Sequence, residues 1–254
     1  MILAIDMGNT NIVVGGIDEN KTYFLERITT VANKTDFEFA VLLQGVLDIT
    51  KRSPEEFDAA ILSSVVPERN EMVVSAVKKI FNIDTMIVNP DMKMNIEIKI
   101  DNKYEAGADL IVDSVAAVEE YPLPLCVIDM GTATTLFIID KDRNFIGGTI
   151  HPGIKLELQS LSSSTSLLPD VMFKTPKKII GTNTVDCMMA GVYYGHAAMI
   201  DGSLKKMEEE LGEPIHAIAT GGMASNVVPL CKHQIALDDA LLLKGLFKLY
   251  EFNK

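Results

Sequence analysis

The feature that most constrains this chain is a short turn that occurs twice. An apolar run ends in Asp6 and leads into Gly8 and then amide and hydroxyl side chains, and the same order returns at Asp129 and Gly131. We expect each run to be a strand with its Asp at the strand end, and each glycine to turn with φ > 0 and approach a ligand closely. Backbone N–H groups and uncharged donors after each Asp suit a polyphosphate. The pattern predicts two phosphate-holding turns in which each Asp faces the ligand through a metal ion.

The order of elements after each turn is also repeated. Each Asp is followed by two strand-like runs and then by a helical pattern. These segments are 12–17, 22–29 and 36–49 after Asp6, and 135–139, 145–150 and 153–168 after Asp129. A strand-strand-strand-helix unit used twice predicts an α/β protein with two lobes, residues 1–115 and 116–254, and a nucleotide in the cleft between them.

Composition excludes several classes of protein. With 254 residues, 48% of them hydrophobic, and a mean hydropathy of +0.20, the chain is globular rather than disordered. A net charge of −12 argues against a nucleic-acid partner. No apolar stretch has the length of a membrane span and no leader precedes the first strand, so we expect a cytoplasmic protein that does not enter a membrane. The three cysteines are scattered, which fits buried thiols in a reducing compartment.

One further carboxylate stands where catalysis would need it. Asp109 follows Gly107-Ala108 and begins an apolar helical run. Phosphoryl transfer needs phosphate positioning, charge neutralisation and one carboxylate that orients the attacking hydroxyl group. From the local sequence, Asp109 is either that general base or an ordinary helix N-cap. The four histidines fit no metal-ligand spacing, so we expect surface or hydrogen-bonded core histidines without a role.

Over nearly its whole length the chain resembles the type III pantothenate kinase family. The residues that carry the resemblance are Asp6–Thr10, Ser63–Pro67, Gly107–Asp109, Asp129–Thr134, Gly181–Thr184 and Thr220–Gly222. The resemblance implies the duplicated ribonuclease H-like fold of actin, Hsp70 and sugar kinases, and a homodimer. It also implies phosphorylation of pantothenate by ATP to 4′-phosphopantothenate, the first step of coenzyme A biosynthesis.

The resemblance also implies roles for individual residues. Contacts to the ATP phosphates would come from Asp6, Met7, Gly8, Asn9, Thr10, Asn11, Ile12, Val13 and Thr132. The implied cofactors are ATP, Mg²⁺ and a monovalent cation, K⁺ or NH₄⁺, held by Asp129. Asp109 would be the general base. The small-molecule acceptor would contact Gly107, Ala108, Asp109, Leu110 and, across the dimer, Thr184.

The acceptor motif departs from the family pattern. That pattern reads Gly-x-Asp-Arg after an Asn-Pro, whereas this chain has Leu110 after Asp109 and Lys103 after Asn102. Arginine offers a substrate carboxylate a planar set of donors, and leucine offers none. Three hypotheses follow: a pantothenate kinase in which Lys103 or a partner-subunit residue replaces the arginine, a kinase of the same fold for another small alcohol, and a non-catalytic nucleotide-binding regulatory paralogue. The intact Asp6, Asp109 and Asp129 count against the third.

Overall fold

The computed structural model describes residues 1–31 and 33–254, which form two compact units. Unit 1 comprises Met1–Ile96, Ile100–Ala116 and Ala240–Lys254, and unit 2 comprises Glu97–Lys99 and Ala117–Asp239. The main boundary therefore falls within helix α3 (Ala108–Glu120). The terminal helix α7 (Leu241–Asn253) belongs to unit 1, although the expected lobes placed it with residues 116–254.

Unit 1 is built on a five-stranded sheet in the order β3-β2-β1-β4-β5. Its strands are β1 (Ile2–Met7), β2 (Asn11–Ile17), β3 (Thr22–Thr29), β4 (Ala59–Ser64) and β5 (Thr85–Ile87). Its helices are α1 (Asp36–Thr50), α2 (Asn70–Phe81), the first turns of α3, and α7, together with the short 3₁₀ segments η1 (Pro54–Glu56), η2 (Pro67–Arg69) and η3 (Lys103–Glu105).

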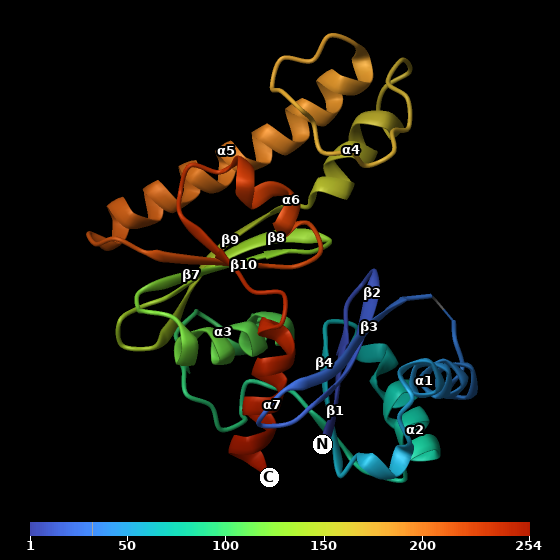
Figure 1. Ribbon diagram of the computed structural model, residues 1–254. Coiled ribbons are helices and arrows are strands. Elements are labelled where there is room, and N and C mark those ends of the chain that lie inside the picture. Colours follow the sequence, from blue (N-terminus) through green and yellow to red (C-terminus); the bar gives the residue numbers. More distant parts are fainter. Residues whose placement is uncertain (32) are drawn as a thin grey trace. The chain divides into compact units, whose positions relative to one another are not determined.

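The alternation of β1 explains why helices cover both faces of this sheet. Leu3, Ile5 and Met7 point to one face and are fully buried in a cluster with residues of α1 and α2. On the other face, a Cβ added to Gly15 of β2 would meet the Leu243 side chain of α7, so α7 packs directly on the sheet. Figure 1 shows α1 and α2 on one side of β1 and β4, and α7 on the other. Because both faces are buried, β1 is apolar up to Asp6.

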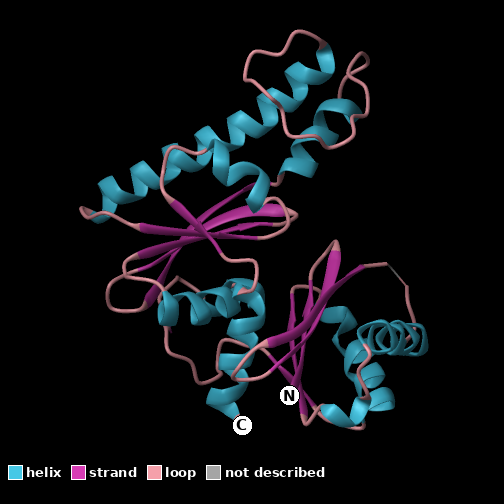
Figure 2. Ribbon diagram, in the orientation of Figure 1, coloured by secondary structure: helices cyan, strands magenta, loops and turns pink. Residues whose placement is uncertain are grey.

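Unit 2 contains a six-stranded sheet in the order β11-β10-β7-β8-β9-β6. Its strands are β6 (Glu97–Ile98), β7 (Leu125–Met130), β8 (Ala133–Ile139), β9 (Asn144–Pro152), β10 (His216–Thr220) and β11 (Ile235–Leu237). Its helices are α4 (Ile154–Ser163), α5 (Thr184–Leu211), α6 (Ala224–Val227) and the short η4 (Val228–Leu230). Residues of α4, α5 and α6 form one apolar cluster with β7 and β8, so these helices cover the same face of the sheet (Figure 2).

The two sheets have the same topology. In unit 1, β1 pairs antiparallel with β2, β2 antiparallel with β3, and β1 parallel with β4, which pairs with β5. In unit 2, β7, β8, β9, β10 and β11 repeat this pattern in the same order, and β2 and β8 each have a register shift near their C-terminal end. Strands β1 and β7 even share their sequence of buried and half-buried positions. The duplication predicted from the sequence is confirmed.

Helix ends follow the local sequence. Helix α1 begins with a capping box in which Thr35 and Glu38 satisfy each other's backbone N–H groups. Helix α5 begins at Asn183, whose side chain accepts a hydrogen bond from the Asp186 N–H group, and ends at Gly212 in the left-handed region, with φ of 75°. These signals explain why the expected helices at 36–49 and 183–211 agree closely with the observed ones.

Two further elements differ from what the sequence pattern predicts. The apolar pattern predicts a strand over 96–100, but the strand β6 has only two residues, which pair with β9 of unit 2. Ser53 and Pro54 predict the start of a short helix, but the structure has the single 3₁₀ turn η1 there. Within residues 1–31 and 33–254, none of the helices is both long enough and apolar enough to cross a bilayer.

Candidate functional site

The first predicted turn is the β1–β2 hairpin of unit 1. Asp6 is the half-buried penultimate residue of β1, and the buried Ser63 of β4 donates its hydroxyl to Asp6 Oδ1 at 2.7 Å. The hairpin is closed by a 3.0 Å hydrogen bond from the Gly8 N–H group to the Asn11 carbonyl oxygen. The Thr30 hydroxyl donates to the Gly8 carbonyl oxygen at 2.8 Å. The carboxylate and the following backbone are thus held by neighbouring strands before any ligand binds.

The second predicted turn is the β7–β8 hairpin of unit 2. Asp129 lies at the end of β7, and glycines from two other strand ends surround the hairpin. A Cβ at Gly221, which follows β10, would lie 2.5 Å from Asp129 Oδ1. A Cβ at Gly153, which follows β9, would lie 2.7 Å from the Gly131 carbonyl oxygen, and the Gly153 N–H group donates to the Thr132 carbonyl oxygen at 3.1 Å. The residue after β10 therefore lies against the Asp129 carboxylate, and the residue after β9 lies against the backbone of Gly131 and Thr132.

The prediction that Gly8 and Gly131 adopt positive φ is wrong. In the part of the chain that the structure describes, the glycines with positive φ are Gly147, Gly212 and Gly221. Gly8 is required for a different reason, because a Cβ there would lie 3.0 Å from the Asn11 carbonyl oxygen. At Gly131 a Cβ would make only ordinary contact, 3.5 Å from Asp129 Oδ2. The left-handed conformation belongs instead to Gly221, in the Thr220–Gly222 loop.

Asp109 is the second residue of α3 and is half-buried. Its Oδ1 accepts a hydrogen bond from the Leu110 N–H group at 2.8 Å, and a Cβ on Gly107 would lie 2.5 Å from the same oxygen. The glycine is therefore what lets the carboxylate fold back over the helix start. Burial raises the pKa of the Asp109 carboxyl above its ordinary value, while hydrogen bonds from the backbone oppose the shift. A raised pKa is typical of carboxylates that act as bases.

Lys103, the candidate to replace the arginine of the family pattern, and its neighbour Tyr104 both contact Asp91. Lys103 Nζ lies 2.6 Å from Asp91 Oδ1, and the Tyr104 hydroxyl lies 3.2 Å from both carboxylate oxygens. Lys103 Nζ also lies 5.3 Å from the centre of the Tyr104 ring. This partly exposed cluster is formed within unit 1, so the Lys103 ammonium already has a carboxylate partner.

Thr184 is the exposed first residue of α5 in unit 2. The preceding Gly181 packs against the first turn of the helix, where a Cβ would lie 2.5 Å from the Cys187 backbone nitrogen. The predicted site residues thus fall into two groups, with Asp6–Val13 and Gly107–Leu110 in unit 1 and Asp129, Thr132 and Thr184 in unit 2.

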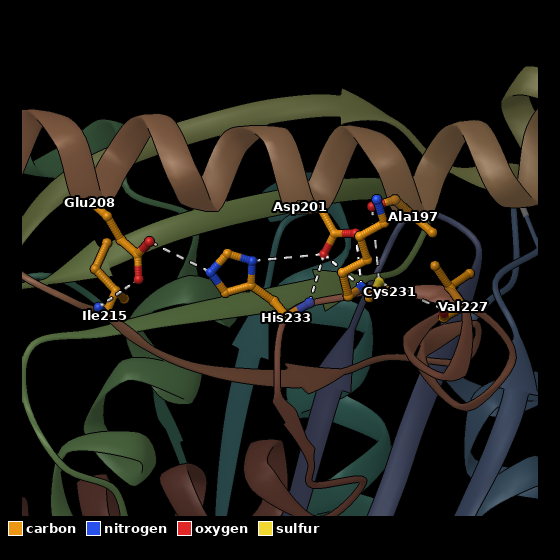
Figure 3. A network of polar contacts seen from close by, with 8 residues as sticks. Ala197, Asp201, Glu208, Ile215, Val227, Cys231 and His233 are labelled. Atoms are coloured by element: carbon orange, nitrogen blue, oxygen red, sulfur yellow. Dashed lines mark hydrogen bonds and ion pairs between the residues drawn. The ribbon is translucent and has the colours of Figure 1, made fainter.

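A polar network fixes the chain between η4 and β11 onto α5 (Figure 3). Asp201 accepts hydrogen bonds from the backbone N–H groups of Lys232 and His233, at 2.8 and 3.0 Å. The His233 ring lies between Asp201 and Glu208, 3.8 and 3.6 Å away, and Glu208 also accepts from the Ile215 N–H group at 3.2 Å. This network ties the segments on both sides of β10 and the Gly221 loop to one helix.

Sequence reasoning missed the roles of two polar residues, Ser63 and His196. Ser63 was recognised only as part of a strand motif, and its contact with Asp6 follows from the parallel pairing of β1 and β4. His196 is buried and bonded on both sides, to Thr134 and to Glu157. The general expectation of a hydrogen-bonded core histidine is confirmed, but its partners are 62 and 39 residues away and left no signal in the sequence.

Comparisons with known proteins agree with this architecture. The sequence profile of the family described as "Type III pantothenate kinase" matches residues 2–206. A type III pantothenate kinase from Halalkalibacterium halodurans is 37% identical over 253 residues, and one from Exiguobacterium sp. is 39% identical over 254 residues; each alignment covers 100% of both chains. A solved ROK family glucokinase from Streptomyces griseus, in complex with glucose and AMPPNP, matches with a TM-score of 0.55 at 11% identity, covering 99% of this chain and 98% of that one. The last likeness confirms the predicted sugar-kinase fold.

Proposed function

Because the chain belongs to the type III pantothenate kinase family, we propose that it transfers the γ-phosphoryl group of ATP to the hydroxyl group of pantothenate. The product, 4′-phosphopantothenate, is the first intermediate of coenzyme A biosynthesis. The observation that carries the proposal is the duplicated hairpin, in which Asp6 and Asp129 stand at equivalent strand ends with backbone and hydroxyl donors after them. Each hairpin offers a carboxylate, backbone N–H groups and uncharged donors, which suit a polyphosphate.

The nucleotide phosphates would be bound by residues of both hairpins. These are Asp6, Met7, Gly8, Asn9, Thr10, Asn11, Ile12 and Val13 from the first hairpin and Thr132 from the second. Asp6 contributes an oriented carboxylate, since Ser63 fixes one of its oxygens. The tip of each hairpin contributes amide or hydroxyl donors, which can bond the phosphate oxygens without adding charge beside the metal ion.

Two cations would complete this site. Magnesium is commonly bound by one or two carboxylates together with substrate phosphates, and the ends of β1 and β7 supply such carboxylates. We assign a monovalent cation, K⁺ or NH₄⁺, to Asp129. Its carboxylate lies close to Gly221, and a carboxylate supplies the hard oxygen ligands and the negative charge that such a cation prefers. When bound, the cations supply charge neutralisation of the phosphates.

Asp109 would act as the general base. Its carboxylate orients the acceptor hydroxyl group and accepts the proton as the oxygen attacks the γ-phosphorus. The Leu110 N–H group holds the carboxylate in one orientation, and burial brings its pKa closer to the working pH. The pantothenate would contact Gly107, Ala108 and Leu110, and Thr184 would reach the pocket from a partner subunit.

A homodimer is supported by the surface of α5. Gly191, Gly195 and Gly202 lie on one exposed face of this helix, and a Cβ at any of them would meet nothing within 4 Å. In the segment before the helix and at its start, Ile179, Ile180 and Val185 expose between 41% and 74% of their surface. A smooth helix face and exposed apolar side chains are what a second copy of the chain would cover.

A second candidate function is favoured by Leu110. A kinase of the same fold could act on another small alcohol that lacks the carboxylate of pantothenate. Lys103, which would otherwise supply a positive charge near this motif, is paired with Asp91. Leucine at position 110 offers an acceptor only apolar contact.

An ADP-release assay with ATP, Mg²⁺ and K⁺ tests both candidates. Pantothenate is compared with a panel of small alcohols and sugars, using the wild-type chain and Asp109→Asn. Pantothenate-dependent turnover that disappears in Asp109→Asn supports the first function. Turnover with another alcohol but not with pantothenate supports the second, and silence with every acceptor contradicts both.

A further inference from the structure

A buried series of carboxylate, imidazole and hydroxyl groups lies within unit 2. His196 on α5 places Nε2 at 2.8 Å from Thr134 Oγ1 on β8, and Nδ1 at 3.3 Å from Glu157 Oε1 on α4. His196 and Thr134 each expose only 1% of their surface, and the Glu157 side chain exposes 30%. Buried polar groups are costly unless they are paired, and here the imidazole is paired on both of its nitrogens.

The order of the groups is that of a nucleophilic triad, but the burial excludes that role. A nucleophile must reach its substrate, and Thr134 has no surface through which to do so. The alternative is that His196 holds in place the β7–β8 hairpin, to which Thr134 belongs. Thr134 pairs with Met130 across the β7–β8 hairpin, so it closes the base of the loop that presents Gly131 and Thr132.

The protons in this series can be assigned from the chemistry of its ends. An ionised carboxylate only accepts, so in the neutral imidazole Nδ1 carries the hydrogen and donates to Glu157. Nε2 then accepts the proton of the Thr134 hydroxyl. Glu157 thus fixes the tautomer and the ring orientation, as carboxylates do for histidines in other sites.

A second connection joins the same elements at the tip of the hairpin. The Gly153 N–H group donates to the Thr132 carbonyl oxygen at 3.1 Å, and the Glu157 N–H group donates to the Gly153 carbonyl oxygen at 3.0 Å. The first turn of α4 is therefore bound to the hairpin twice. One connection is Gly153 at the tip, and the other is the Glu157–His196 pair at the base.

We propose that His196 is a positioning residue for nucleotide binding, which acts through Thr134 to hold the Asp129–Thr132 hairpin in its binding conformation. The proposal rests on the proposed function in one respect only, the assignment of this hairpin to the nucleotide. It adds two residues on two helices, His196 and Glu157, that touch no ligand themselves and set the geometry of the residues that do.

The test compares two substitutions that each keep half of the histidine's contacts. In His196→Gln the side-chain amide reaches the position of Nε2 and can still bond Thr134. In His196→Asn the amide ends near the position of Nδ1 and can bond only Glu157. We expect His196→Asn to weaken binding of ADP and of a non-hydrolysable ATP analogue about 3- to 10-fold by calorimetry, the range of one lost hydrogen bond, and His196→Gln to restore most of it. The KM for ATP should rise with little change in kcat.

A double-mutant cycle with Thr134→Val shows whether the effect passes through Thr134. Because valine keeps the shape and removes the hydroxyl, adding His196→Asn to Thr134→Val should cost no further nucleotide affinity. Thr134→Ser, which keeps the hydroxyl, is the matched control. If the losses of nucleotide affinity in the two single variants add in the double variant, the effect does not pass through Thr134. If His196→Asn and His196→Gln lose nucleotide affinity equally and in step with their melting temperatures, the histidine is merely structural. Either result would overturn the proposal.

The outcome is separable from that of the proposed function. Nucleotide binding is measured without any acceptor, and pantothenate turnover is measured separately on the wild-type chain. Nucleotide binding that depends on His196 in a chain that does not phosphorylate pantothenate would support the inference and contradict the function. Wild-type chain that binds no nucleotide would overturn both.

Discussion

Ser63 donates its hydroxyl to Asp6 Oδ1 across 2.7 Å, from a side chain with no exposed surface. The contact is a consequence of the parallel pairing of β1 with β4, which sets the two residues side by side. It fixes one oxygen of the carboxylate toward the interior of the sheet. The ligand proposed for Asp6 would therefore meet a carboxylate whose orientation is already set, so less ordering entropy would be lost on binding.

Replacing Ser63 by alanine should weaken Mg²⁺–ATP binding more than it weakens the fold. The loss of one hydrogen bond to a carboxylate is expected to cost about 1 kcal/mol, or roughly fivefold in Kd, measured by calorimetry. Ser64→Ala is the matched control, because Ser64 is the next residue along β4 and its Oγ accepts a hydrogen bond from the Val66 N–H group. Equal nucleotide affinity in the two variants would contradict a role for Ser63 in orienting Asp6.

Unit 2 has a hydroxyl in the equivalent position. Thr220 of β10 stands opposite Asp129 of β7 in the parallel ladder, as Ser63 stands opposite Asp6. It is followed by Gly221, whose φ of 91° belongs to the left-handed region. The two units thus place a buried hydroxyl beside each Asp, and unit 2 adds a glycine that approaches the carboxylate.

Gly221→Ala should destabilise unit 2 and impair nucleotide binding. A Cβ there would lie 2.5 Å from Asp129 Oδ1 and 2.7 Å from the Met130 nitrogen, and the left-handed conformation alone costs an alanine about 1–2 kcal/mol. Chemical denaturation measures the loss. Gly45→Ala in α1 is the control, because its Cβ would meet nothing within 4 Å and alanine should stabilise the helix by up to about 1 kcal/mol. A Gly221→Ala chain as stable as wild type would show that the loop is not held against Asp129.

Asp129→Asn should shift the dependence of turnover on potassium. An amide keeps the shape of the carboxylate but loses the charge that attracts the cation, so we expect a higher potassium concentration for half-maximal rate and weaker nucleotide binding. Asp140→Asn is the control from the same unit. Its carboxylate accepts from the backbone of Asp142 and Asn144 in the β8–β9 turn. If both variants respond to potassium like wild type, the cation is not bound at Asp129.

Features that leave a local pattern in the sequence could be predicted, and features that depend on packing between distant segments could not. The duplicated topology was predictable because two strands and a helix follow each Asp in the same order, and apolar periodicity is local. The placement of α7 in unit 1 was not, since it depends on Gly15 admitting the Leu243 side chain. Periodicity shows that a helix is amphipathic without showing which sheet it covers.

The candidate site shows the same division. Asp6, Asp109 and Asp129 could be picked out because each lies two residues from a glycine at the end or start of an apolar run. The contacts that orient them could not. Ser63 reaches Asp6 across 57 residues, a contact fixed by strand pairing. The left-handed glycine was misplaced because a glycine near an Asp signals close approach as well as positive φ, and only the backbone distinguishes the two.

The pH dependence of turnover should report Asp109. Burial raises the pKa of its carboxyl, and a base must be ionised, so the rate should fall as the pH falls through that raised pKa. The acid limb of kcat/KM for the acceptor is therefore expected above the ordinary Asp value of about 3.9. A pH–rate profile of the wild-type chain measures it. An acid limb at or below that value would contradict a buried base.

Asp109→Asn provides the stability counterpart. When the folded-state pKa of a carboxyl is raised, its contribution to stability is complete below the unfolded-state pKa and is lost as the pH rises through the folded-state pKa. At neutral pH the ionised Asp109 therefore costs stability, and the asparagine variant should be at least as stable as wild type while phosphoryl transfer is abolished and ATP binding is kept. A chain that loses both stability and activity would indicate that Asp109 has a structural role in the first turn of α3 instead of acting as a base.

Leu110→Arg should change acceptor recognition without changing nucleotide binding. The family pattern has arginine at this position, and the nearby Lys103 is engaged by Asp91 at 2.6 Å, so the wild-type chain has no arginine to form a paired contact with the carboxylate of pantothenate here. We expect the arginine to lower the KM for pantothenate severalfold, on the scale of one charge-assisted contact, with the KM for ATP unchanged.

The control for this substitution is Leu110→Met, which keeps the volume and the apolar character of the half-buried side chain. If the natural acceptor lacks a carboxylate, Leu110→Arg should instead gain pantothenate turnover while losing turnover of that acceptor, and Leu110→Met should leave both unchanged. An arginine variant with the same KM for pantothenate as the methionine variant would place the carboxylate of the acceptor away from residue 110, and the donor that binds it would then have to come from another segment or from a partner subunit.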